Sequence, residues 1–181
     1  MKKIFYFLFL FFLSFACSSP QDKKSSDENN SSNFGVISKS IIETTKAYLS
    51  SQLKKPKIEV GTNSIKIWNE EMLYIVTTKD INIGLIDEDN TQDAIVSYLI
   101  VPTGKTKYRK HLLMLNKGEM KVVCDFISEM KVMQISNRIV YAEIPKYGAN
   151  SPLHTCDKCM NNIQYKLAGD SLQLIKNTSP E

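Results

Sequence analysis

Glycine and histidine, two residues common in phosphate-binding and catalytic sites, are scarce in this chain. Its 181 residues include seven glycines and two histidines. The motifs Gly-x-Ser-x-Gly and His-Glu-x-x-His are absent from the sequence, and so is a glycine-rich phosphate loop. The common signatures of serine hydrolases, zinc proteases and nucleotide-binding enzymes are therefore missing, and catalysis is the less favoured class of function.

Arginine is also rare, and charge of neither sign dominates. Arg109 and Arg138 are the only arginines, although arginine is the side chain that most often reads phosphate and guanine. The chain has 23 Lys+Arg and 19 Asp+Glu, and without Lys2 and Lys3 the balance is 21 against 19. This is not the charge footprint of a nucleic-acid-binding protein, so we expect no nucleic-acid partner.

No apolar run is long enough to span a bilayer. The longest one follows Lys2 and Lys3 and covers about a dozen residues, whereas a membrane-spanning helix needs about 20. A short positive segment followed by such a run is typical of a cleavable export signal. The sequence therefore predicts that residues 1–16 are a signal peptide.

The end of this run carries a cysteine. The segment Leu13-Ser14-Phe15-Ala16-Cys17 resembles the lipobox, the cleavage site of bacterial lipoproteins, with Ser14 where the family more often has leucine. The resemblance implies cleavage before Cys17 and acylation of that cysteine, for example with palmitate, which would hold the chain on a membrane. Ser18 replaces the aspartate of an inner-membrane retention signal. The resemblance thus implies the cell envelope and an outer membrane, at its periplasmic face or at the cell surface.

The rest of the chain divides into a tether and one domain. Residues 18–33 contain no large apolar side chain, so residues 17–34 are expected to form a disordered tether that begins with the lipidated cysteine. Residues 35–177 are long enough for one domain with its own core. Apolar residues at helical spacing predict an amphipathic helix over residues 36–53, which Pro56 cannot continue.

Beyond Pro56 the pattern changes to period-two alternation and β-branched runs, which predicts strands and no second helix. Turn-forming links at Asn116–Glu119 and Ala168–Asp170 predict hairpins and antiparallel pairing. We therefore expect the α+β class, with one N-terminal amphipathic helix packed on a curved antiparallel β-sheet in a cystatin-like or NTF2-like arrangement. A small β-sandwich or barrel is the alternative. The expected strands are Lys57–Val60, Ser64–Trp68, Met72–Thr77, Ile81–Ile86, Ala94–Val101, Tyr108–Asn116, Met120–Phe126, Ile135–Ile144, Ile163–Leu167 and Ser171–Ile175.

One acidic loop is a candidate calcium site. Asp87, Asp89, Thr91 and Asp93 alternate along it, and calcium prefers several such oxygen ligands. The pattern resembles the Asp-x-Asp-x-Asp-Gly turns of FG-GAP-type and dockerin-type proteins, although this loop lacks the glycine and a closing bidentate glutamate. The alternative is a solvated hairpin loop stabilised by an Asx-turn.

The second candidate site is a cluster of soft ligands. His154, Cys156 and Cys159 lie within six residues, and Cys124 could supply a fourth ligand for tetrahedral zinc. In an oxidising compartment such cysteines more often form a disulfide, either Cys156–Cys159 or Cys124 with one of them. A redox-active Cys-x-x-Cys pair is the third possibility.

The C-terminal half also resembles uncharacterised secreted bacterial proteins. The matching features are an Asp-x-x-x-Asp-Ala-Ile-Val turn that begins at Asp89, the pair Cys156 and Cys159, and the hairpin Tyr165–Leu172. This resemblance implies an exported domain of no known activity. His111, which lies in the expected strand Tyr108–Asn116 beside Leu112, is interpreted as a residue of the sheet.

Taken with the export signal, these features favour a membrane-anchored envelope lipoprotein whose domain binds a protein, a peptide or a glycan without catalysis. The alternative is an envelope module that binds calcium or zinc. An enzyme of unknown class is the third hypothesis.

Replacing Cys17 with alanine tests the anchor. Without acyl chains the chain loses its attachment to lipid, so Cys17→Ala should move the protein from the membrane fraction to the soluble fraction. A variant that still sediments with membranes and resists carbonate extraction would show that the lipoprotein hypothesis is wrong.

Overall fold

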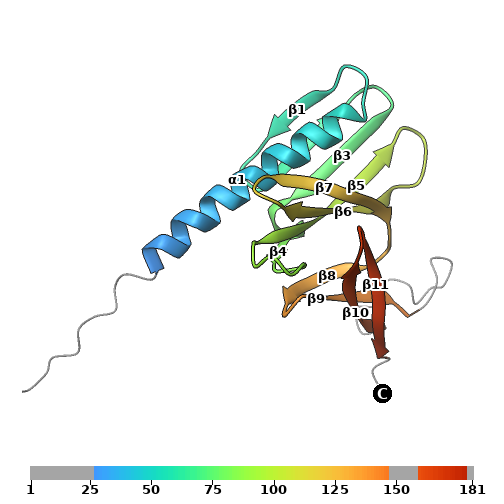
Figure 1. Ribbon diagram of the computed structural model, residues 1–181. Helices are drawn as coiled ribbons and strands as arrows, with labels where there is room; N and C mark the ends of the chain where they lie inside the picture. The colour runs from blue at the N-terminus through green and yellow to red at the C-terminus, as the bar shows by residue number, and fades with distance from the viewer. Residues whose placement is uncertain (1–26, 147–158, 179–181) are drawn as a thin grey trace, which may run out of the picture.

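The computed structural model describes residues 27–146 and 159–178, with side chains from Ser38 onward, and its strands form two antiparallel sheets (Figure 1). This part of the chain has eleven strands and one α-helix, so the predicted α+β class is wrong and the fold is nearly all β. The β-sandwich alternative is compatible with this architecture. The elements are α1 (Asp27–Ser51), β1 (Lys57–Val60), β2 (Ser64–Trp68), β3 (Met72–Thr77), the 3-10 turn η1 (Thr78–Asp80), β4 (Ile81–Gly84), β5 (Asp93–Pro102), β6 (Tyr108–Asn116), β7 (Met120–Ile127), β8 (Lys131–Ser136), β9 (Ile139–Pro145), β10 (Met160–Ala168) and β11 (Ser171–Thr178).

Sheet A contains seven strands and sheet B contains four. Sheet A has the order β1-β2-β3-β5-β6-β7, and β4 pairs with β5 beside β3. Sheet B has the order β11-β10-β9-β8. In Figure 1, sheet B lies below sheet A on the side of β4, and β1, β2 and β3 extend away from it. Sheet B therefore covers only part of one face of sheet A.

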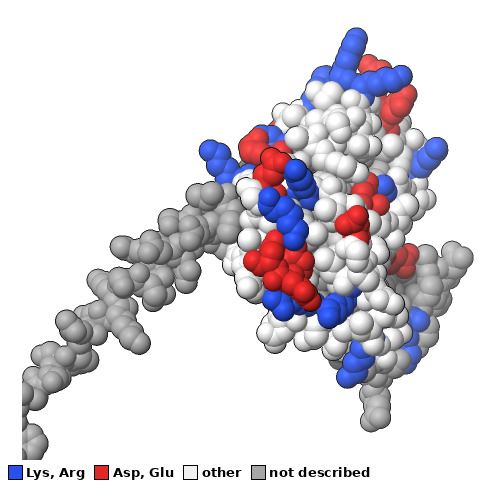
Figure 2. All heavy atoms as spheres, in the orientation of Figure 1, with Lys and Arg blue, Asp and Glu red and all other residues white. Residues whose placement is uncertain are grey.

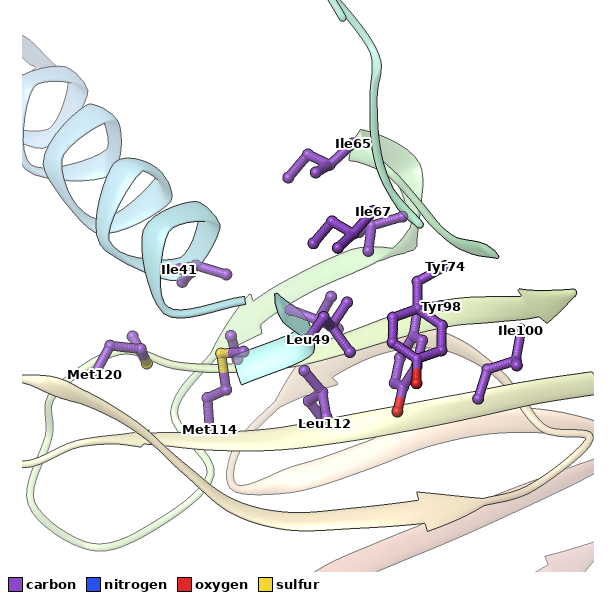
Figure 3. Close-up of a cluster of buried hydrophobic side chains, with 13 residues drawn as sticks. Ile41, Leu49, Ile65, Ile67, Tyr74, Tyr98, Ile100, Leu112, Met114 and Met120 are labelled. Carbon is purple, nitrogen blue, oxygen red and sulfur yellow. The ribbon is translucent and has the colours of Figure 1, made fainter. Parts of the chain in front are cut away.

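The central strand β5 is buried on both faces. Its alternate residues Val96 and Tyr98 join the core beneath α1. Figure 3 shows Tyr98 in this core with Ile41 and Leu49 of the helix. Ile95 points the other way, into the core shared with sheet B. This two-sided burial explains the nearly continuous apolar sequence of β5, because a strand covered on both faces has no polar face.

Two boundaries differ from those expected. The helix begins at Asp27 instead of residue 36, so it includes residues 27–34 of the expected tether, and residues 17–26 lie outside the described residues. The single strand expected over Ile135–Ile144 is two strands. Asn137 and Arg138 separate them with φ of 52° and 61°, the paired positive values of a tight hairpin turn. None of the described helices is long and apolar enough to cross a membrane.

The predicted hairpins are confirmed at both links. Gly118 lies between β6 and β7 with φ of 88°, and Gly169 lies between β10 and β11 with φ of 60°. A left-handed backbone suits glycine because it has no Cβ to clash with the following carbonyl. These turns fix the register of the strands that they join.

A close approach at Gly84 joins the two sheets. A Cβ at this position of β4 would lie 2.7 Å from the Ile135 Cβ and 2.9 Å from its carbonyl oxygen on β8. Only glycine lets the two backbones come this close. The contact fixes sheet B against the β4 side of sheet A.

Replacing Gly84 with alanine should force β4 and β8 apart. Overpacking of this kind costs about 1–3 kcal/mol in the free energy of unfolding, or more where backbone atoms must move. Gly61→Ala is the matched control, because its Cβ would meet nothing nearer than 3.6 Å. Urea denaturation of both variants measures the difference, and equal stability of the two would show that the contact is not tight.

Candidate functional site

Asp93, a candidate calcium ligand, points inward. The residue is fully buried, and its carboxylate accepts hydrogen bonds from three backbone N–H groups: Ile86 at 2.9 Å, Asp87 at 3.3 Å and Asn116 at 3.0 Å. Burial raises the pKa of this carboxyl group, and the three backbone donors oppose that rise. Asp93 thus joins the β4–β5 loop to the end of β6, and its oxygens are already occupied by backbone donors.

Two other carboxylates of the same loop, Asp87 and Asp89, pair with a lysine. The Lys117 ammonium, from the β6–β7 turn, donates to Asp89 at 2.8 Å and also to Asp87. Asp89 further accepts from the Thr91 backbone N–H at 2.9 Å. Figure 2 shows acidic side chains gathered over the loop after β4, with basic side chains beside them.

Lys117 therefore supplies the positive charge that a metal ion would supply in a calcium loop. Pairing with Asp87 and Asp89 raises the pKa of the Lys117 ammonium, and the Lys117 hydrogen bond lowers the pKa of the Asp89 carboxyl. Within residues 27–146 and 159–178, no group of three or more His, Cys, Asp and Glu side chains converges as a metal site. Calcium would have to displace Lys117.

The two cysteines in the described part of the chain are one free thiol and one disulfide-bonded sulfur. Cys124 carries a free, half-buried thiol on β7, so the alternative in which it pairs with Cys156 or Cys159 is wrong. Cys159 is disulfide-bonded, and a disulfide sulfur has no thiolate with which to bind zinc. Its partner lies outside the described residues, as do His154 and Cys156, so the Cys156–Cys159 pairing stays a prediction.

His111 lies in β6, which confirms its interpretation as a sheet residue. It is fully buried and stacks on Phe126, with ring centroids 5.2 Å apart. Its Nε2 lies 3.1 Å from the Ser128 carbonyl oxygen, so this nitrogen carries the proton. Its Nδ1 then accepts from the Ser97 hydroxyl at 2.8 Å.

The Ser97–His111 contact has the geometry of a nucleophile and its base, but a substrate cannot reach it. Both residues are at most 2% exposed. Burial lowers the pKa of His111 to about 4, which removes the affinity for protons that a general base at neutral pH needs. The pair instead holds the connection between β7 and β8, where the chain passes from sheet A to sheet B.

A polar cluster not predicted from the sequence attaches the helix to sheet A. The Asp125 carboxylate accepts from Tyr48 at 3.2 Å, Tyr98 at 3.1 Å and Lys110 at 2.9 Å. Burial raises the pKa of both tyrosines, and the Asp125 charge adds to the rise. Because these groups satisfy one another, the cluster acts as a structural contact between α1 and β5, β6 and β7.

A groove of about 500 Å³ lies over the ends of β2, β3 and β5. Ile65 and Ile67 of β2 point to the core under α1, so Trp68 points to the opposite face, beyond the cover of sheet B. We call this hollow the Trp68 groove. Its lining is mostly apolar and consists of Glu59, Lys66, Trp68, Asn69, Met72, Leu73, Val101, Pro102, Thr103 and Gly104.

The groove was missed because its residues come from separate strands. The registers Trp68↔Leu73 and Leu73↔Val101 place three large apolar side chains in one row across β2, β3 and β5. Lys66 and Glu59 form an ion pair of 3.4 Å at the rim. One signal was present in the sequence: the single tryptophan of the chain shares a strand face with a lysine.

Replacing His111 with glutamine should reduce the loss of stability in acid. An unfolded histidine has a pKa of about 6.5 and the folded one about 4, so the unfolded state takes up the proton first as pH falls. His111 therefore contributes stability that is present above pH 6.5 and is lost between 6.5 and 4, at about 1.4 kcal/mol per pH unit. Urea denaturation at pH 7 and pH 5 measures this, and an identical pH dependence in His111→Gln would contradict it.

Comparisons with protein-family models, with curated proteins and with solved structures found no match to this chain. Its function must therefore be inferred from the chemistry of its own residues.

Proposed function

We propose that this chain is an exported, lipid-anchored envelope protein whose folded domain is a binding module, with the Trp68 groove as its ligand site. The Trp68 groove is the observation that carries the proposal. Its volume of about 500 Å³ lies within the range of about 300–1,000 Å³ that ligand sites occupy. An apolar floor with few charged groups at the rim is the usual composition of such sites.

The charged clusters outside the groove support binding over catalysis. Asp87 and Asp89 are engaged by Lys117, and Asp125 is engaged by Tyr48, Tyr98 and Lys110. Ser97 and His111 are buried, and neither lines the groove, so this nucleophile–base pair cannot act on a ligand bound there. The groove itself offers apolar contact area and one ion pair, which suits recognition of a ligand better than proton transfer to it.

The proposed lipid anchor would place the binding module at an envelope membrane. The lipobox-like segment ending at Cys17 would tie the chain to an envelope membrane, with residues 18–26 between the lipid and the start of α1. A module on such an anchor meets envelope partners at a high local concentration, which raises its apparent affinity without new contacts.

Site-specific crosslinking in the native envelope tests this function. A photo-crosslinking residue in place of Thr103, at the rim of the groove, should give a defined adduct, and one in place of the exposed Gln173 on β11 should not. Trp68→Ala should reduce the Thr103 adduct at least tenfold if its melting temperature stays near that of the parent. Absence of a Thr103-specific adduct, or an adduct insensitive to Trp68→Ala, would contradict the proposal.

A further inference from the structure

The outer edge of β1 is a free, regular strand edge beside the Trp68 groove. Among the described residues no strand pairs with β1 on the side away from β2. Natural sheets blunt such edges with bulges or cover them. The outer strands β7, β8 and β11 each pair with their neighbour through a register shift, and β4 packs against β8 at Gly84. The pairing of β1 with β2 has no such shift.

The hydrogen-bond pattern shows which groups this edge presents. The Gly61 N–H donates to the Ser64 carbonyl at 2.8 Å. In an antiparallel pair, hydrogen-bonded and non-hydrogen-bonded residues alternate, so Glu59 and Lys57 also bond inward to β2. The N–H and C=O groups of Ile58 and Val60 therefore point outward. Their side chains are also 46% and 58% exposed.

We propose that β1 and the adjoining rim of the Trp68 groove bind an extended acidic peptide segment, which adds to sheet A as a further strand. This names the ligand class of the site above and so rests on the proposed function. Alternating donors and acceptors at strand spacing match an extended polypeptide backbone. A glycan or an acyl chain has no such backbone.

The side chains of β1 define the pattern of the peptide. Ile58 and Val60 lie on the α1 side of the sheet, opposite Ile67 and Ile65, so they contact apolar residues of the added strand. Lys57 lies on the groove face, opposite Trp68. The side chains of the peptide that alternate with these apolar ones point to the groove face, where they lie beside Lys57 and the groove rim. Alternation of apolar and polar residues follows from this geometry.

Charge selects an acidic peptide. Lys54, Lys55 and Lys57 are exposed at the start of β1. The acidic residue of the strand, Glu59, is already paired with Lys66. Glu70 and Glu71 on the neighbouring β2–β3 turn offset two of the three lysines, so the net charge at this edge is positive, and an acidic segment would associate faster and more tightly at low salt.

The test selects ten-residue peptides from a random displayed library on the full-length chain, purified in detergent. Enriched peptides should be acidic, with apolar residues at alternate positions, and should change the emission of Trp68, the only tryptophan. Hydrogen exchange of the Ile58 and Val60 amides should slow at least tenfold in the complex. No enriched peptide, or enriched peptides that are basic, would overturn the proposal while leaving the crosslinking result at Thr103 intact.

A matched pair of variants tests the backbone contact. Val60→Pro removes an outward N–H without breaking a bond to β2, whereas Val60→Thr keeps that N–H. We expect Val60→Pro to weaken peptide binding at least tenfold and Val60→Thr to weaken it less than threefold. If Val60→Pro fails to fold, the same peptide with alternate backbone nitrogens methylated takes its place, and methylation in one of the two registers should abolish binding. Binding that survives both changes would overturn strand addition.

Discussion

The structure depends on the burial of β5 on both faces. Its alternate residues enter two separate cores, one under α1 and one under sheet B. Complete burial of a large aliphatic side chain contributes about 1.5–3 kcal/mol, so a strand with apolar residues on both faces holds three layers together. The neighbouring strand β6 repeats the arrangement, since Leu112 and Met114 face the helix and Leu113 and Leu115 face sheet B. The single helix therefore covers one face of sheet A, and most of the core beneath it comes from the strands.

Three polar side chains, Asp93, His111 and Asp125, lie where these layers meet, and each has hydrogen-bond partners that explain its place. Asp93 opens β5 and binds three backbone N–H groups of the adjoining loop and turn. His111 joins Ser97 to the chain that leaves sheet A for sheet B. Asp125 joins the helix to three strands. A buried polar group without partners is costly, so such fully paired groups fix one arrangement of the layers.

The sequence predicted local structure better than the arrangement of layers. Period-two patterns located β1, β2, β3 and β6 to the residue, because alternation is a local property of a strand. The turn at Asn137 and Arg138 was missed since neither is glycine, and two strands were taken as one. The α+β class was wrong for a related reason. One helix on a sheet was evident from the pattern, but the packing of β8–β11 on sheet A as a second sheet depends on contacts distant in sequence, such as that between Gly84 and Ile135.

At the candidate site, too, features formed by neighbouring residues could be predicted from the sequence, and features formed by residues distant in the chain could not. The acidic loop was visible as a run of carboxylates, but the sequence did not reveal that Lys117, about thirty residues away, supplies the positive charge between Asp87 and Asp89. The Trp68 groove arises from a mismatch of layers. Sheet A has seven strands and sheet B four, and sheet B covers only the β4 side of the face that points away from α1. On this face β2 and β3 are therefore left open. The side chains on this open face are not packed against another layer, unlike those in the rest of the sheet. An apolar row of Trp68, Leu73 and Val101 on such a face has a cost in water that a bound partner would remove.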